Sequence, residues 1–129
     1  MKKTLIILYW VSTVLLSAFL LFAAVGHITM SPEIVANTQR LGFPVALMPF
    51  LGVLKILAAL TILTGRRGDL TIGAYAGIFF YGLGAVMLHL AGGDALPMAG
   101  GGILLTLLSL SSYALWRRTR DRLPSPVFA

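Results

Sequence analysis

A single lysine stands in the otherwise apolar stretch GVLKILAALTIL, residues 52–63. On insertion scales, a lone ammonium at the centre of a transmembrane helix costs at least about 2.5–3.5 kcal/mol. A polar partner, water or loss of the proton usually offsets this cost, and ionisable side chains at such depth often mark functional sites. Two interpretations of Lys55 therefore stay open. It is either held by helix carbonyls, Tyr81 and water, or it contributes to a ligand-binding pocket.

Two histidines, His27 and His89, lie near the ends of apolar stretches and are expected at the same membrane surface as Glu33. We expect His27, His89 and the segment around Glu33 to roof an outward-facing pocket whose floor is Lys55. Paired haem ligation would need both histidines on facing helices across an open gap, and two histidines without a wider motif do not predict haem. No metal-binding motif occurs, and the chain has no cysteine, so we assign no metal ligand.

The elements that must position these residues are four long apolar stretches, residues 4–25, 43–64, 70–90 and 98–116. Each is close to the ~20 residues with which a helix crosses a bilayer. Of the 129 residues, 58% are hydrophobic and 11% are charged, which is too little charge to cover a soluble domain. We therefore predict one all-α integral membrane domain, residues 1–129, with four transmembrane helices in an antiparallel bundle.

The basic residues gather on one side of this predicted topology. Lys2 and Lys3 precede the first span, two arginines separate the second and third spans, and four more lie in the basic tail, residues 117–129. The opposite loops contain only Arg40. This positive-inside pattern predicts a multi-pass protein of the bacterial cytoplasmic (inner) membrane with both termini in the cytoplasm. The basic residues that produce the net charge of +6 then lie near lipid head groups, so this charge does not indicate a nucleic-acid partner.

One connecting segment has the pattern of a short helix. Ser31 can cap a helix, Pro32 suits the first helical position, and Glu33 favours the positive N-terminal end. The apolar residues that follow share one face. We predict a short amphipathic helix over residues 32–41 that lies on the external surface as a lid.

Small and hydroxyl-bearing side chains recur at helical spacing in every span, as in transmembrane helices that pack closely. The third span carries two such stripes: Gly82, Ala85 and His89 on one, and Gly73, Gly77, Tyr81 and Gly84 on the other. Gly73 and Gly77 form a GxxxG element. We predict that this element packs within the monomer, with homo-oligomerisation as the alternative.

Three stretches carry a family resemblance: MKKTLIILYWVSTVLLSAFLLF, LGFPVALMPFLGVLKILAALTIL and YAGIFFYGLGAVMLHLAGGD. They resemble the DoxX-like family of small bacterial membrane proteins over nearly the whole chain. The resemblance implies four spans with a short segment after the first. Named relatives are associated with quinone-linked sulfur oxidation and with redox-stress membrane complexes, so it also implies a redox context. Cysteine-dependent chemistry cannot carry over to a chain without cysteine.

Two classes of function remain open. In the first, an outward-opening bundle pocket binds a lipophilic small molecule, a quinone or a lipid-like compound, and the protein is an accessory subunit for an oxidoreductase partner. In the second, a membrane enzyme uses Lys55 and His89 as an acid–base pair on a lipid-like substrate. A small transporter is a weaker third reading, because no buried acid is available to carry a proton. No catalytic motif occurs, so no catalytic residue is assigned. Quinone is the candidate cofactor, and haem is not expected. The ligand-binding candidates are Lys55, His89, His27, Tyr81 and Glu33.

Overall fold

Four membrane-spanning helices and one short helix make up the part of the chain that the computed structural model describes, residues 2–122. Each of four segments is long and apolar enough to cross a bilayer: Lys2–Ile28, Val45–Leu63, Asp69–Ala91 and Leu96–Thr119. The predicted all-α, four-span architecture is therefore confirmed. The elements, in chain order, are α1 (Lys2–Ile28), α2 (Pro32–Arg40), the 3₁₀ turn η1 (Val45–Leu47), α3 (Met48–Leu63), α4 (Asp69–Ala91), η2 (Leu96–Ala99), α5 (Gly100–Thr119) and η3 (Arg120–Arg122).

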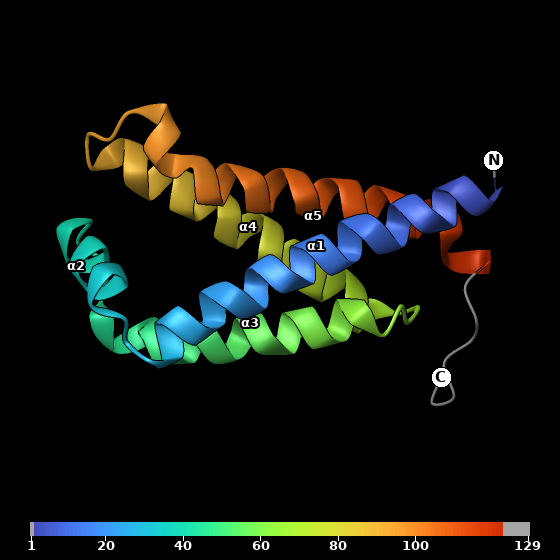
Figure 1. The fold of residues 1–129 in the computed structure, drawn as a ribbon, viewed down its shortest axis with the longest axis horizontal. Coiled ribbons are helices and arrows are strands. Elements are labelled where there is room, and N and C mark those ends of the chain that lie inside the picture. The colour runs from blue at the N-terminus through green and yellow to red at the C-terminus, as the bar shows by residue number, and fades with distance from the viewer. Residues whose placement is uncertain (1, 123–129) are drawn as a thin grey trace.

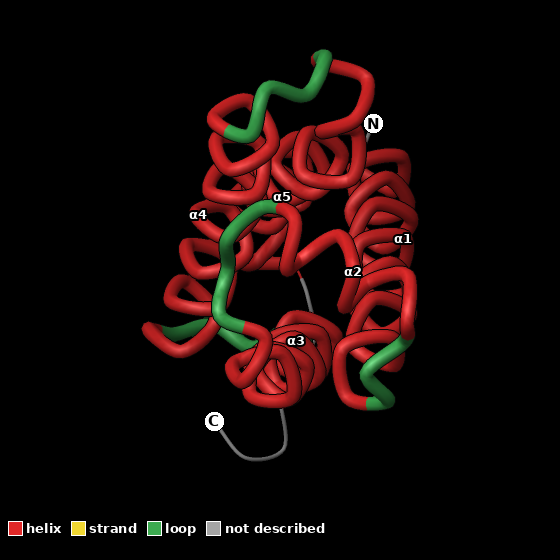
Figure 2. The backbone as a smooth tube through the Cα atoms, turned by 90° about the vertical axis from the view of Figure 1, so that its left-hand side faces the viewer, coloured by secondary structure: helices red, strands yellow, loops and turns green. Residues whose placement is uncertain are grey.

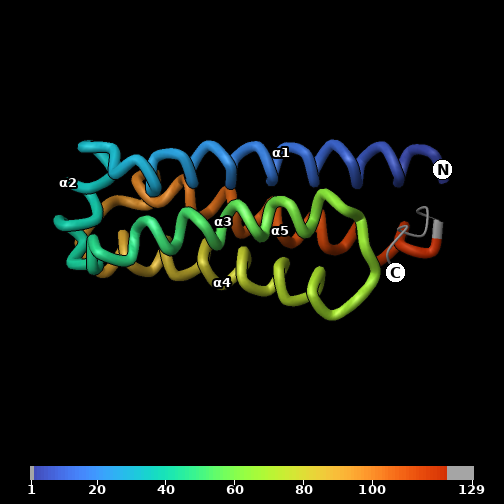
Figure 3. Tube along the Cα trace, turned by 90° about the horizontal axis from the view of Figure 1, so that it is seen from below, coloured from blue at the N-terminus to red at the C-terminus, as the bar shows by residue number. Residues whose placement is uncertain are grey.

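The four long helices lie lengthwise beside one another, with α1 crossing the bundle in front of α4 in the view of Figure 1. The start of α1 and the end of α5 share one end of the bundle, and α2 lies at the opposite end (Figures 1 and 3). Seen along the bundle, α2 lies across that second end (Figure 2). Any site covered by α2 is thus at the end remote from the basic termini.

Two helical segments are longer than the spans predicted for them, because their ends continue into polar sequence. The first predicted span, residues 4–25, becomes α1, which extends to Ile28 and so includes His27. The last, residues 98–116, becomes η2 and α5, which extend to Thr119. The predicted basic tail therefore starts as helix. Its residues 123–129 lie outside the described part of the chain.

Helix α2 forms where the sequence predicts it, after Ser31 and with Pro32 in its first turn. Its apolar side chains Ile34 and Val35 are half-buried, whereas Glu33 and Asn37 are exposed. Ser31 precedes the helix, but its side chain makes no capping hydrogen bond, so the prediction of a serine cap is wrong in this detail. The helix is instead fixed by packing, since Ile34 lies directly over Gly26 of α1.

Close helix contacts form at small residues that the sequence places on inward faces. A Cβ atom on Gly82 of α4 would lie 2.7 Å from Thr106 Oγ1 and 3.0 Å from the carbonyl oxygen of Gly102, both on α5. A Cβ atom on Gly52 of α3 would lie 3.1 Å from the carbonyl oxygen of Ala24 on α1. The bundle is thus two closely packed helix pairs, α1 with α3 and α4 with α5. Its buried apolar core consists of Tyr9, Leu16, Leu20, Ala59, Ile62, Tyr75, Ile78, Leu105 and Trp116.

The GxxxG element does not pack within the monomer, so that prediction is wrong. Gly73 and Gly77 are exposed, and a Cβ atom on either would meet nothing within 4 Å. The reason is the neighbouring face of α4, where Tyr75 and Ile78 fill the core and so turn the glycines outward. The glycines lie on the outer surface of the bundle, where large apolar side chains such as Phe80 (66% exposed) contact the hydrocarbon of the bilayer.

Candidate ligand-binding site

Lys55 is buried at the meeting point of three helices. It is the eighth of the 16 residues of α3 and is 5% exposed. Its Nζ atom donates a hydrogen bond to the hydroxyl of Tyr81 on α4 at 2.8 Å and lies 4.3 Å from the centroid of the same ring. The Nζ atom also lies 3.3 Å and 3.2 Å from Nδ1 and Nε2 of His27 on α1. The lysine is therefore held by two aromatic side chains.

The ammonium of Lys55 lies over the face of the His27 ring. It is almost equally distant from both ring nitrogens, and an in-plane approach at these distances would collide with the ring carbon between them. Nδ1 of His27 is 2.8 Å from the carbonyl oxygen of Ala23. Because a carbonyl can only accept, Nδ1 carries the hydrogen and donates it there. The lone pair of Nε2 thus remains available for another partner.

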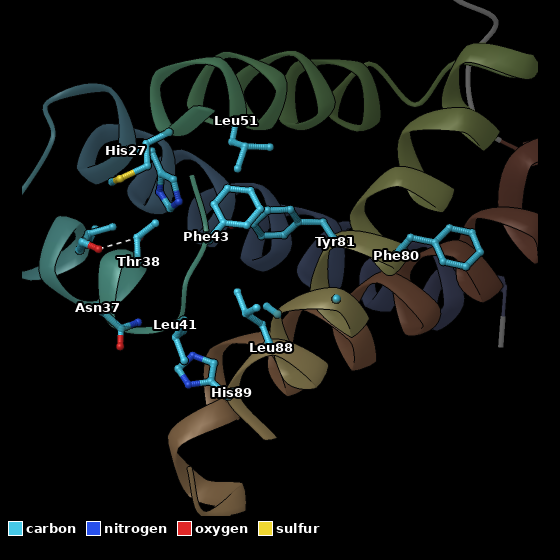
Figure 4. Close-up of a pocket in the computed structure, with 14 residues that line it drawn as sticks. His27, Asn37, Thr38, Leu41, Phe43, Leu51, Phe80, Tyr81, Leu88 and His89 are labelled. Carbon is cyan, nitrogen blue, oxygen red and sulfur yellow. Dashed lines mark hydrogen bonds between the residues drawn. The ribbon is translucent and has the colours of Figure 1, made fainter. Parts of the chain in front are cut away.

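A cavity of about 430 Å³ lies beside this cluster, at the α2 end of the bundle (Figure 4). Helix α2 and the segment after it form one side of the cavity, and the halves of α3 and α4 nearest to α2 form the other. The imidazole of His27 and the ring of Tyr81 reach into it, whereas Phe80 points away (Figure 4). The lining residues are His27, Ile34, Asn37, Thr38, Leu41, Phe43, Met48, Leu51, Phe80, Tyr81, Gly84, Ala85, Leu88 and His89.

His89 stands on another side of the cavity and belongs to an ion-pair network. Its Nδ1 atom is 2.7 Å from Oδ2 of Asp94, and Arg40 of α2 donates to both oxygens of the same carboxylate at 2.9 Å and 2.8 Å. The Arg40 guanidinium, with the hydrogen bond from His89, holds the pKa of the Asp94 carboxyl at about 2, below its usual value of 3.8. The same pairing raises the pKa of Arg40. Asp94 thereby fastens α2 to the end of α4.

The structure brings together some of the predicted site residues and separates others. Lys55, His27 and Tyr81 form one cluster, and His27, Tyr81 and His89 share the cavity wall. Lys55 lies behind His27 and Tyr81 and is not part of that wall. Its polar partners are these two residues, whereas the partner of His89 is Asp94, so no contact supports the Lys55–His89 acid–base pair. Glu33 is exposed on α2, and although α2 covers the cavity, Glu33 is not among its lining residues.

Sequence reasoning missed the Arg40–Asp94 pair and the contact between Lys55 and His27. The available signal is that Arg40, the single basic residue of the loops opposite the basic termini, and the acidic Asp94 lie in loops on the same side of the predicted topology. Within residues 2–122, no three His, Asp or Glu side chains lie close enough together to hold a metal ion.

Comparison with known proteins places the chain in a family. The model of the DoxX-like family matches residues 11–111, which include every residue that lines the cavity, together with Lys55 and Asp94. No curated protein and no solved structure matches the chain. The match covers most of the chain, including all of α3 and α4 and the larger parts of α1 and α5. The chain therefore belongs to the DoxX-like family and is a multi-pass membrane protein of that family.

Proposed function

We propose that this DoxX-like protein binds a lipophilic small molecule of the quinone class in the cavity beneath α2. The observation that carries the proposal is the arrangement of polar atoms in this cavity. His27 and His89 stand on separate sides of a mainly apolar space, and each uses Nδ1 for a hydrogen bond within the protein. Each therefore presents Nε2 for a ligand. The volume of about 430 Å³ lies within the range of roughly 300–1,000 Å³ that small-molecule sites occupy.

A quinone fits this arrangement because it is a flat apolar ring with one oxygen at each end. A neutral imidazole accepts a hydrogen bond at Nε2 from a quinol hydroxyl, and the Tyr81 hydroxyl in the same cavity wall can donate one to a quinone carbonyl. Two imidazoles on separate sides of the cavity can thus serve both oxygens of one ring. The apolar side chains between them, Leu41 and Leu88 among others, suit the faces of the ring.

Lys55 and Tyr81 contribute to this site as a connected pair. The Tyr81 hydroxyl accepts the hydrogen bond from Lys55 Nζ at 2.8 Å, which leaves its own hydrogen free to be donated. Because Tyr81 lines the cavity, that hydrogen is available to an oxygen of the ligand. A hydroxyl that accepts from a cation is also a stronger donor, since hydrogen bonds in series polarise one another. Lys55 therefore acts through Tyr81 as a positioning residue.

The proposal includes an orientation and a partner. We place the end that carries Lys2, Lys3 and the arginines of α5 and η3 in the cytoplasm of a bacterial cell and α2 on the outer side of its cytoplasmic membrane. In this setting the protein is an accessory subunit of a membrane redox system, and an oxidoreductase partner exchanges electrons with the bound quinone. The charge asymmetry between the two ends of the bundle supports the orientation.

Ligand analysis of purified protein tests the proposal. The parent, Tyr81→Phe and Tyr113→Phe proteins are purified in the same mild detergent, and their organic extracts are compared by mass spectrometry. Tyr113 is a matched control, because it is a half-buried tyrosine that does not line the cavity. We expect a quinone in extracts of the parent and of Tyr113→Phe, and severalfold less in Tyr81→Phe. A parent without quinone, even after incubation with it, would refute the function, and equal retention by all three proteins would refute the site.

A further inference from the structure

A second cavity, of about 230 Å³, lies in the groove between α3 and α4, deeper in the bundle than the ligand cavity. Leu51 and Tyr81 line both cavities, so the two spaces adjoin. From this boundary the groove follows α3 as far as Ala58 and α4 as far as Ala74. Each distance is seven residues, or about 10 Å of helix. The two cavities together form one elongated space that bends past Tyr81.

The groove is apolar apart from Lys55 and Tyr81, and it opens on the outer surface of the bundle. Leu54, on one edge, is 43% exposed, and Gly77, on the other, is also exposed. In a membrane-spanning bundle this surface faces the hydrocarbon of the bilayer. The groove therefore connects the bilayer with the polar cluster of Lys55, Tyr81 and His27.

We propose that this groove holds the hydrocarbon tail of the ligand, and that the ligand enters sideways from the bilayer between α3 and α4. This inference rests on the proposed function and extends it to the ligand class, an amphiphile with a polar ring and one linear isoprenoid or alkyl tail. The tail of such a molecule must leave the cavity beneath α2. An exit past α2 leads toward water, whereas the groove leads to lipid, so the hydrophobic effect favours the groove.

Gly77 is the residue that keeps the groove open on α4. A Cβ atom at this position would meet nothing within 4 Å, so an added side chain begins in open space. Gly73 lies one turn away on the same face, has equally open surroundings, and lines neither cavity. The two glycines are therefore a matched pair, of which only Gly77 borders the proposed tail site.

The experiment compares Gly77→Leu with Gly73→Leu in lipid nanodiscs. The probes are decylubiquinone and the same benzoquinone ring without its decyl tail, and binding is measured by extraction from immobilised nanodiscs after subtraction of empty ones. The decyl tail moves from lipid into an equally apolar groove, so it adds little net binding energy. Both probes should therefore bind the parent, when affinity is calculated from the concentration of probe in the lipid. In Gly77→Leu, the affinity for decylubiquinone should fall about tenfold or more, while the affinity for the tail-less ring stays unchanged. In Gly73→Leu, both affinities should equal those of the parent.

The outcomes separate the inference from the function on which it rests. Equal binding of decylubiquinone by all three proteins would overturn the tail site and leave the proposed function intact. A parent that binds neither probe above empty nanodiscs would overturn both. A second pair guards against a folding defect in Gly77→Leu, namely Leu54→Trp at the groove edge and Leu57→Trp on the lipid-facing side of α3. Selective loss of decylubiquinone in Leu54→Trp supports the tail site, and parent-like binding by both tryptophan variants overturns it.

Discussion

Replacement of the buried lysine by methionine separates a structural role of Lys55 from a role in binding. Methionine keeps most of the bulk of the lysine stem and removes both the charge and the hydrogen bond to Tyr81. We expect Lys55→Met to accumulate and fold like the parent but to lose at least about tenfold in ligand affinity, because the Tyr81 hydroxyl is no longer oriented toward the ligand.

The expected effect on stability follows from opposing terms of similar size. A charged lysine at the centre of a membrane helix costs at least about 2.5–3.5 kcal/mol. The hydrogen bond from a charged donor to Tyr81 returns about 1.5–3 kcal/mol, and contact with an aromatic face returns up to about 2 kcal/mol when desolvated. The substitution removes all of these terms and leaves the Tyr81 hydroxyl beside a cavity that can hold a partner. The free energy of unfolding should therefore change by no more than about 2.5 kcal/mol, in either direction.

The assay combines thermal unfolding followed by circular dichroism with the quinone-binding measurement in nanodiscs. Ile56→Met is the matched control, because it introduces the same side chain at the next position of α3, which lines neither cavity. Full ligand affinity in Lys55→Met would show that the lysine is not needed for binding. Failure of Lys55→Met to accumulate, while Ile56→Met accumulates normally, would show that the bundle needs the lysine for folding. Either result would refute the assignment of Lys55 as a positioning residue.

Three further predictions concern the bundle and its lid. Gly82→Ala should lower the free energy of unfolding by about 1–3 kcal/mol, because its Cβ would lie 2.7 Å from Thr106 Oγ1, whereas Gly73→Ala should be neutral or slightly stabilising in the same denaturation assay. The folded-state pKa of Asp94 is lowered to about 2, so its pairing with Arg40 and His89 should be complete above about pH 4 and lost as the pH falls through 2. Spin labels on Gln39 and Leu96 should report a fixed distance at pH 7 that Asp94→Asn broadens, and an unchanged distance would contradict the role of Asp94. Reporter fusions at the two ends of the chain should both indicate the cytoplasm, and a periplasmic C-terminus would contradict the orientation.

Much of the bundle follows from the spacing of small and polar residues in the sequence. In α1, Thr13, Ser17 and Ala24 recur at helical spacing and are buried, and in α3 Gly52 and Ala59 are buried beside Lys55. Periodicity identifies such a face when the other faces carry bulky apolar side chains. Helix α4 is different, because it has small residues on two faces. Its inward face was decided by the packing of Tyr75 and Ile78, which spacing alone does not reveal.

Two contacts of the site, Lys55 with His27 and Arg40 with Asp94, depend on axial register, which is why the sequence did not predict them. His27 and Lys55 are 28 residues apart, and Arg40 and Asp94 are 54 apart. Helical spacing assigns each residue to a face but does not say which turns of two helices lie side by side. That register is set by the path of the chain through α2 and η1 and by close contacts such as Gly52 against Ala24. Of the pairings of Lys55, the one with Tyr81 was expected from the sequence, whereas the one with His27 was not.

The lid and the cavity wall are coupled through one carboxylate. Helix α2 has nine residues, too few to be stable by itself in water, so its position depends on tertiary contacts. Leu41, at its end, covers Gly92, and Arg40 is bound by Asp94. Oδ2 of Asp94 accepts from Arg40 and also from His89, so the group that holds the lid also fixes the imidazole that faces the ligand. Asp94 thereby sets both the closure of this end of the bundle and the orientation of His89. A membrane-dissolved ligand can then reach the site through the groove between α3 and α4, without opening of the lid.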